Sequence, residues 1–233
     1  MELFPKTDSG NGDCRDEDRT EQREISEYGE EIMQEVSVII PNFNGMAYLD
    51  GVLAGLECQT VNNFEVILVD NGSSDGSCAF VSARYPWVHL IELPENFGFC
   101  KSVNEGIKAS RAPYVLLLNN DIEVTENFIE EMISAIRRHP KAFSCAARMI
   151  QFHDRDKLDD AGNYYCALGW AYARGKGKDI HTYEKEEKIF ASCAGAAIYR
   201  KKIFDKIGLF DEEHFAYLED TDIGYRAQIA GYE

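Results

Sequence analysis

The stretch Tyr114–Val124 reads Tyr-Val-Leu-Leu-Leu-Asn-Asn-Asp-Ile-Glu-Val, an apolar run that ends in two amides and a carboxylate. Residues Tyr114–Leu118 do not alternate between polar and apolar side chains, which predicts a strand that is buried on both faces. Such strands belong to parallel sheets covered by helices, and ligands bind beyond the carboxyl ends of the strands. The pattern therefore places Asp121 at a ligand-binding edge, although an Asp in this position also suits a helix cap or a turn.

The same order of apolar strand, polar loop and helix repeats along the chain. Four apolar runs predict strands, at residues 36–40, 64–69, 88–93 and 114–118. Apolar residues at helical spacing follow each run. We expect Pro41 to stop the first strand, residues 143–150 and 192–199 to add strands, and residues 151–188 to form an insert of loops and short strands. The alternation predicts an α/β fold with a doubly wound, mostly parallel sheet flanked by helices.

Composition limits the classes of partner. The 233 residues, 45% of them hydrophobic, suffice for one large domain or two small ones. The net charge of −17 argues against a nucleic acid or an anionic membrane bound by electrostatic attraction alone. Twelve acidic and four basic residues fall within the first 35 positions. We therefore predict an acidic, disordered or loosely helical arm at residues 1–33 and one folded domain at residues 34–233.

The cysteines and the apolar runs bear on the cellular location. The seven cysteines are scattered and contain no Cys-x-x-Cys pair, so neither a disulfide framework nor a zinc site is indicated. The sequence starts without a signal-peptide pattern, and no apolar run approaches the roughly 18 residues that a membrane helix needs. We expect a cytoplasmic protein without a transmembrane segment.

Carboxylates recur at the predicted edge of the sheet. Asp70 and Asp121 each follow a predicted parallel strand, so the two side chains should converge. Further along the chain, Glu219, Asp220 and Asp222 precede a helical pattern, and we expect Asp222 to cap that helix. The chain lacks both the Gly-x-Gly-x-x-Gly pattern after its first strand and a P-loop. A diphosphate at this acidic edge would therefore need a divalent cation, since Mg²⁺ prefers carboxylate and phosphate oxygens together.

Six segments, in order along the chain, carry a more specific signal. They are Val-Ser-Val-Ile-Ile-Pro-Asn-Phe-Asn (36–44), Val-Asp-Asn-Gly-Ser-Ser-Asp-Gly-Ser (69–77), Glu-Asn-Phe-Gly-Phe (95–99), Leu-Asn-Asn-Asp (118–121), Ala-Gly-Ala-Ala (194–197) and Glu-Asp-Thr-Asp-Ile-Gly-Tyr-Arg (219–226). In these segments the chain resembles glycosyltransferase family 2, which has the GT-A fold, and its rhamnosyltransferase-like members. The resemblance implies an inverting transfer of a sugar, rhamnose among the candidates, from a UDP- or dTDP-sugar to an acceptor hydroxyl. The acceptor would be a glycan or a lipid-linked molecule in polysaccharide or cell-surface glycan synthesis, with peripheral membrane contact through that acceptor.

The resemblance also implies roles for individual residues. The positions that match donor-binding residues of the family, for the base, the ribose and the rest of the nucleotide sugar, are Pro41, Phe43, Asp70, Asn71, Asn96 and Asn120. Asp121 matches the residue that holds Mg²⁺ or Mn²⁺, and Asp220 matches the general base. The chain departs from the family pattern at Asn119, where an Asp is usual, and it ends before the region that supplies a metal-binding His in many members. On this basis we expect a domain truncated at its C-terminus.

Two other readings of these residues stay open. A nucleotidyltransferase would use similar carboxylates and Mg²⁺ on a related sheet, and an inactive nucleotide-sugar-binding module would keep only the donor site. The Glu219-Asp220 pair favours transfer over nucleotidyl activation, because activation of a sugar phosphate needs no such base. Residue by residue, Asn96 also suits a turn and Phe43 a core aromatic.

Overall fold

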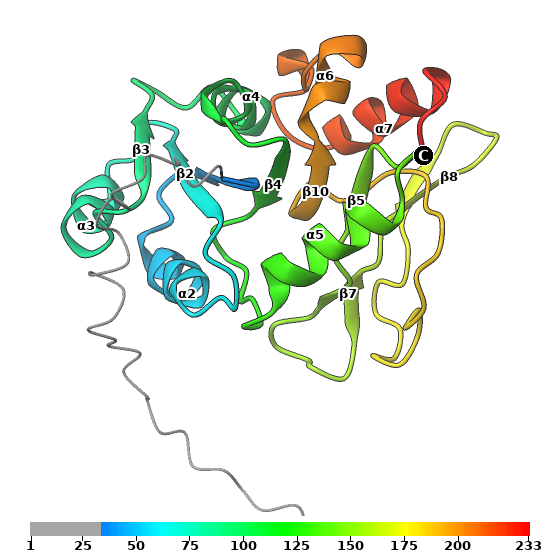
Figure 1. The fold of residues 1–233 in the computed structure, drawn as a ribbon, viewed down its shortest axis with the longest axis horizontal. Coiled ribbons are helices and arrows are strands. Elements are labelled where there is room, and N and C mark those ends of the chain that lie inside the picture. Colours follow the sequence, from blue (N-terminus) through cyan, green and yellow to red (C-terminus); the bar gives the residue numbers. More distant parts are fainter. Residues whose placement is uncertain (1–33) are drawn as a thin grey trace, which may run out of the picture. The chain divides into compact units, whose positions relative to one another are not determined.

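The computed structural model describes residues 34–233, so the predicted arm at residues 1–33 lies outside the described residues. The domain is built on a six-stranded sheet of order β3-β2-β1-β4-β10-β5. These strands are β1 (Val36–Asn42), β2 (Phe64–Asp70), β3 (His89–Glu92), β4 (Tyr114–Leu118), β5 (Ser144–Ala146) and β10 (Ala196–Arg200). Strands β1 to β4 pair with one another in parallel, and β10 is antiparallel to both β4 and β5. The prediction of a doubly wound, mostly parallel sheet is confirmed (Figure 1).

Helices cover both faces of this sheet (Figure 1). They are α2 (Met46–Glu57), α3 (Ser77–Arg84), α4 (Phe99–Ala109), α5 (Phe128–Arg138), α6 (Lys201–Ile207) and α7 (Glu219–Ile229), with a short 3₁₀ helix at Glu212–His214. None of the helices within residues 34–233 is long and apolar enough to cross a membrane.

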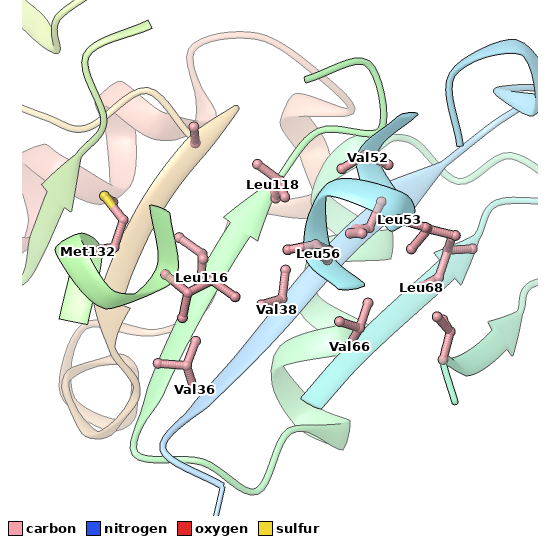
Figure 2. Packing of buried hydrophobic residues seen from close by; sticks show 14 of the residues in the cluster. Val36, Val38, Val52, Leu53, Leu56, Val66, Leu68, Leu116, Leu118 and Met132 are labelled. Atoms are coloured by element: carbon pink, nitrogen blue, oxygen red, sulfur yellow. The ribbon is translucent and has the colours of Figure 1, made fainter. Parts of the chain in front are cut away.

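The central strand β4 explains why its sequence shows no alternation. Leu116 and Leu118 belong to a cluster with α2 and α5 on one face, and Figure 2 shows Leu116 beside Met132 of α5 and Leu118 farther along the strand, toward Val52 of α2. Val115 and Leu117 belong to a second cluster on the opposite face, with α4, α6 and α7. All four side chains are fully buried, so each face of the strand removes apolar surface from water.

Strand β1 continues through Pro41 to Asn42, so the prediction that Pro41 stops the strand is wrong. The pairing of β1 with β4 ends at Ile39, whereas its pairing with β2 continues to Asn42. The carbonyl of Asn42 accepts from the backbone N–H of Asn71, so Asn42 faces the β2 side and Pro41 faces the β4 side. Pro41 therefore lacks its N–H at a point where no neighbouring strand needs one.

The predicted strand at residues 143–150 divides between two sheets. Its first part is β5, and its second part is β6 (Met149–Ile150), which pairs with β7 (Leu158–Asp160) in a separate two-stranded sheet. The last backbone hydrogen bond between this segment and β10 runs from the N–H of Ala147 to the carbonyl of Ala196. The rest of the insert contains the hairpin of β8 (Asn163–Tyr165) and β9 (Ala171–Ala173), in agreement with an insert of loops and short strands.

Candidate functional site

The carboxyl ends of β2, β1 and β4 are joined by a chain of side-chain hydrogen bonds. Asn42 at the end of β1 donates from Nδ2 to Oδ1 of Asp70 at 2.7 Å. Asn120 after β4 donates from Nδ2 to Oδ1 of Asn42, also at 2.7 Å. The other carboxylate oxygen of the buried Asp70 accepts from the backbone N–H of Ser73 at 2.8 Å. The structure therefore brings Asp70 and Asn120 to one edge, with Asn42 between them.

A second set of hydrogen bonds fixes the loop that follows β3. Asn71 accepts at Oδ1 from the N–H of Phe97 at 2.9 Å and donates from Nδ2 to Oδ1 of Asn96 at 2.9 Å. Oδ1 of Asn96 also accepts from the N–H of Gly98, two residues later, as a turn-forming Asn does. Gly98 has φ of 89°, and a Cβ there would lie 2.6 Å from the carbonyl oxygen of Phe215. Only glycine fits this close approach, so Asn71 and Asn96 lie in a backbone with little freedom to move.

Phe43 lies at the surface beside this edge. Its side chain is 47% exposed, so the alternative of a core aromatic is wrong. The next residue, Asn44, has φ of 50°, and its backbone N–H donates to Oγ of Ser73 at 2.8 Å. Its Oδ1 accepts from the N–H of Ser74 at 2.9 Å. The turn after β1 is thereby tied to the turn after β2, and the exposed side chain of Phe43 lies at the same edge.

Asp121 follows Asn119 and Asn120 in the turn after β4 and is exposed. Within residues 34–233 its carboxylate has no hydrogen bond or ion pair, so both oxygens are available to a cation. No group of three or more His, Cys, Asp or Glu side chains in this part of the chain is arranged to hold a metal ion. Mg²⁺ is commonly held by one or two carboxylates together with substrate phosphates, so the single free carboxylate of Asp121 fits that mode.

Asp220 lies in the first turn of α7, and hydrogen bonds from two residues, Asn163 and Thr221, fix its half-buried carboxylate. Oδ2 accepts from Nδ2 of Asn163 at 2.8 Å, and Oδ1 accepts from the backbone N–H of Thr221 at 2.6 Å. Burial raises the pKa of Asp220 above that of an ordinary Asp, and the two hydrogen bonds oppose the rise. A carboxylate with a raised pKa is a stronger proton acceptor than a solvated one.

The surroundings of Asp220 are acidic and partly dry. Burial, and then the nearby charge of Asp220, raises the pKa of Asp160 to about 6, although the N–H of Gly162 lowers it. Burial and the charge of Asp220 also raise the pKa of Glu219, whose Oε2 is buried without a hydrogen-bond partner in the described part of the chain. Three carboxyl groups thus share a region where their charges disfavour one another.

The expectation that Asp222 caps α7 is wrong. The helix begins after Leu218, and no side chain caps it. Asp222 instead accepts from Nε and Nη2 of Arg226, one turn later, at 2.9 and 2.7 Å. The guanidinium of Arg226 also donates to the carbonyls of Ile207 and Leu209, so the pair joins α7 to the end of α6. Asp222 therefore stabilises the packing of the helix that carries Asp220.

The loop before β10 contacts both the β4 edge and the surroundings of Asp220. The carbonyl of Gly195 accepts from the N–H of Asn119 at 2.8 Å, and Cys193 lies beside Gly195. Burial raises the pKa of the Cys193 thiol to about 12, with contributions from the charges of Asp160 and Asp220. The structure shows no direct contact between the side chains of Asp121 and Asp220. A ligand that reached both would therefore lie along this loop.

Sequence reasoning missed two residues of this arrangement. Asn42 lies inside a quoted motif, and its place after Pro41 at a strand end was a usable signal. Asn163 lies in the insert, where no period or motif marks it, and only the fold brings it to Asp220. Its role could not be found from local sequence.

Comparison with known proteins agrees with this architecture. The family model described as glycosyl transferase family 2 matches residues 37–208. An N-acetylglucosaminyl-diphospho-decaprenol L-rhamnosyltransferase of Mycobacterium tuberculosis is 27% identical over 218 residues, which cover 84% of this chain and 71% of that protein. The chain therefore belongs to glycosyltransferase family 2, and a rhamnosyltransferase is among its relatives, as the sequence resemblance implied.

Solved structures show the fold alone. TarS of S. aureus, solved as residues 1–349 in complex with UDP, has a TM-score of 0.61 at 20% identity and is matched over 83% of this chain. The mannosyltransferase PcManGT of Pyrobaculum calidifontis, in complex with GDP-Man and Mn²⁺, has a TM-score of 0.64 at 14% identity over 86% of this chain. This chain spans about half the length of each, 54% in both cases. The fold is of the GT-A type.

Proposed function

We propose that this chain is an inverting glycosyltransferase that moves a sugar, rhamnose among the candidates, from a UDP- or dTDP-sugar to an acceptor hydroxyl. The acceptor is a glycan or a lipid-linked molecule in polysaccharide or cell-surface glycan synthesis. One observation carries the proposal. The hydrogen-bonded ends of β1, β2 and β4 offer acceptor atoms to a ligand, and the loop before β10 connects this edge to the surroundings of Asp220, whose pKa is raised. The cytoplasmic location expected from the sequence stays a prediction.

In this proposal the nucleotide lies across the ends of β1 and β2. Phe43 and Pro41 contact the base, since an exposed ring at a fixed turn can stack on it. Asp70 keeps lone pairs free beyond its two accepted hydrogen bonds and accepts from a ribose hydroxyl. Asn71 and Asn96 hold the loop that borders the nucleotide. This side of the edge thus recognises the base and the ribose of the donor.

The diphosphate lies at the end of β4. Asp121 would hold Mg²⁺ or Mn²⁺, and Asn120, fixed by its bond to Asn42, orients the turn that presents Asp121. When bound, such a cation neutralises negative charge on the leaving diphosphate. The chain itself carries 41 acidic against 24 basic residues, so its net charge of −17 repels a diphosphate. Metal dependence is therefore part of the proposal, and a relative of the same fold contains Mn²⁺.

Asp220 takes the proton of the acceptor hydroxyl. As that oxygen bonds to the anomeric carbon, the proton moves to a carboxylate oxygen of Asp220, and the bond from carbon to the diphosphate oxygen breaks with inversion. Asn163 and Thr221 keep the carboxylate in one orientation. A nucleotidyltransferase has no need of such a fixed base, which favours sugar transfer over that alternative.

The first experiment measures thermal unfolding of the full chain with UDP, dTDP and GDP, each with Mn²⁺ and with EDTA. A ligand that binds only the folded state raises the unfolding temperature, and the stabilisation grows with the logarithm of its concentration relative to Kd. We expect UDP or dTDP to stabilise the chain, and Mn²⁺ to be required. The matching sugar nucleotide should then release its nucleoside diphosphate when an acceptor is added, with inversion at the anomeric carbon by NMR. If none of the nucleotides changes the unfolding temperature, the proposal is wrong.

A further inference from the structure

The β8–β9 hairpin carries exposed apolar side chains away from the domain core. Residues 163–173 contain no charged side chain, in a chain of which 28% is charged. At the tip, Leu168 is 85% exposed and Trp170 is 71% exposed. Figure 1 shows the hairpin at the periphery of the domain beside α7, where Tyr165 contacts Tyr225 with ring centroids 5.7 Å apart. This surface is both apolar and projecting.

Ring stacking and backbone hydrogen bonds fix the conformation of the hairpin. Tyr165 stacks on Phe190, with ring centroids 4.9 Å apart and planes at 19°. At the turn, the N–H of Cys166 donates to the carbonyl of Trp170, and the N–H of Gly169 donates to the carbonyl of Cys166, both at 2.9 Å. The fold therefore holds Leu168 and Trp170 outside, where apolar groups of this size are costly unless something covers them.

The hairpin begins next to Asp220, the residue proposed as the general base of the reaction. Asn163, the first residue of β8, donates to Asp220 at 2.8 Å. A strand rises about 3.3 Å per residue, so the three steps from Asn163 to Cys166, where the turn begins, extend about 10 Å. One short element thus runs from the carboxylate that would activate the acceptor to an uncharged, exposed tip.

We propose that the tip of the β8–β9 hairpin enters the interfacial region of a lipid bilayer and so brings the head of a lipid-linked acceptor to Asp220. This inference rests on the proposed function and names the class of acceptor. Trp and Tyr, both present here, are the residues enriched at the boundary of lipid and water. The absence of charge from residues 163–173 removes the desolvation cost that a charged tip would meet.

The size of the tip favours lipid over a second copy of the chain. A large aromatic side chain buries about 150–250 Å², and the tip presents one Trp and one Leu as its most exposed groups. A stable protein interface needs about 800 Å² from each partner. Tyr225 and Ile229, one turn apart on α7, are also exposed and extend the apolar surface next to the hairpin. A bilayer requires no matching protein surface and accepts a patch of this size.

Tryptophan fluorescence of the full chain tests the membrane contact directly. The chain has two tryptophans, Trp170 at the tip and Trp87, which is half-buried and donates to Glu57. The Trp87→Phe variant therefore reports on Trp170 alone, and Trp170→Phe reports on Trp87 alone. With vesicles of phosphatidylcholine and phosphatidylethanolamine, Trp170 emission should shift to the blue, and bromine on the acyl chains should quench it. Trp87 emission should not change. Equal behaviour of the two variants, or no quenching of either, overturns the proposal.

Turnover separates failure of this inference from failure of the proposed function. The double variant Leu168→Ser/Trp170→Ser should lose vesicle binding and transfer to a lipid-linked acceptor in vesicles, yet keep transfer to a short water-soluble acceptor. Phe152→Ser is the matched control, since Phe152 is 53% exposed in the separate loop between β6 and β7. If the double variant uses the lipid-linked acceptor as well as the parent does, or if sedimentation shows that the tip joins two copies, the inference is wrong. Absence of any sugar transfer by the parent is evidence against the proposed function, and the quenching result stands by itself.

Discussion

The strand-end edge and the surroundings of Asp220 solve opposite physical problems. At the edge, Asn42, Asp70 and Asn120 satisfy one another through short hydrogen bonds. Around Asp220, burial raises the pKa of neighbouring carboxyl groups, and Glu219 keeps a buried oxygen without a partner. The first region is electrostatically satisfied and suited to positioning. The second holds unfavourable electrostatic energy, which is typical of residues that transfer protons.

The difference shows how one fold can divide the work of a transfer reaction. A rigid edge fixes a substrate in place, and much of the rate of a two-substrate reaction comes from such positioning. Partial burial of a carboxylate raises its pKa, which makes it a stronger base and at the same time lowers the stability of the fold. Substitutions in the first region should therefore act on stability and nucleotide binding, and those in the second on turnover and its dependence on pH.

The largest effect is expected from Asp220→Asn. The substitution keeps the size of the side chain and one hydrogen-bond acceptor but removes the proton acceptor, so turnover should fall by roughly 10²–10⁴. Nucleotide affinity should stay within a few-fold, because the donor edge is untouched. Steady-state rates and nucleotide titrations on the same preparation measure both. Near-normal turnover would mean that Asp220 only shapes the start of α7.

Asp121→Asn should give the next largest effect, and unlike Asp220→Asn it should weaken nucleotide binding. Even residues that only support a metal ligand change metal affinity by about 10–100-fold, so loss of the ligand itself should weaken Mn²⁺-dependent nucleotide binding at least as much. Turnover should fall with it. Titration of nucleotide with Mn²⁺ and with EDTA is the measurement. Glu123→Gln, on the same exposed segment and paired with Arg155, is the control. If nucleotide binding ignores the metal in the parent chain, the role of Asp121 is wrong.

Asn42→Ala should show, through the free energy of unfolding, how much the hydrogen bonds at the strand-end edge stabilise the fold. The change removes a donor from the buried Asp70 and an acceptor from Asn120, and a charged group left with fewer partners costs about 3 kcal/mol. Denaturant unfolding should show this loss at pH 7. Ser74→Ala, in the exposed turn next to it, should cost far less. Equal stability of Asn42→Ala and the parent would mean that the edge is held by its backbone alone.

The sequence predicted the first region better than the second, for a physical reason. The carboxyl ends of parallel strands lie at one edge of the sheet, so Asp70 and Asp121 could be placed at that edge from the apolar runs that precede them. The continuation of β1 past Pro41 could not be predicted, because it depends on which neighbouring strand each backbone group faces. The pattern of side chains does not show this. Asn163 reaches Asp220 through a hairpin that packs on α7, and Asp222 pairs with Arg226 rather than capping. The Asn163 contact arises from tertiary packing, which local sequence does not record, whereas the Asp222–Arg226 pair has the i, i+4 spacing of neighbours on one helix and was readable from the sequence.

Asp160→Asn should stabilise the chain at neutral pH. The folded pKa of Asp160, about 6, lies above its ordinary value of 3.8, so the folded chain holds this proton where the unfolded chain has lost it. Stability therefore falls as the pH rises from about 4 to about 6 and stays lower above that range. Asn removes the charge and can still accept from Gly162, so a gain of about 2 kcal/mol is expected at pH 7.5. Denaturant unfolding at pH 7.5 and pH 4 should show the gain only at the higher pH. A gain of equal size at both would assign it to packing.

The smallest expected effect, that of Asn163→Ala, distinguishes a positioning residue from a merely structural one. Asn163 donates to Oδ2 of Asp220, and this bond favours the ionised carboxylate. Without it, the pKa of Asp220 should rise further, since only the donors of Thr221 remain among the described residues while Glu219 and Asp160 still disfavour its charge. A hydrogen bond to a charged group is worth about 1.5 kcal/mol, which equals about one pH unit. A base acts in its deprotonated form, so activity is lost as the pH falls through this pKa. The acidic limb of the profile of kcat against pH should therefore move up by about one unit, with little loss on the plateau. A variant that loses activity equally at every pH, with an unmoved limb, would show that Asn163 supports the hairpin and does not tune Asp220.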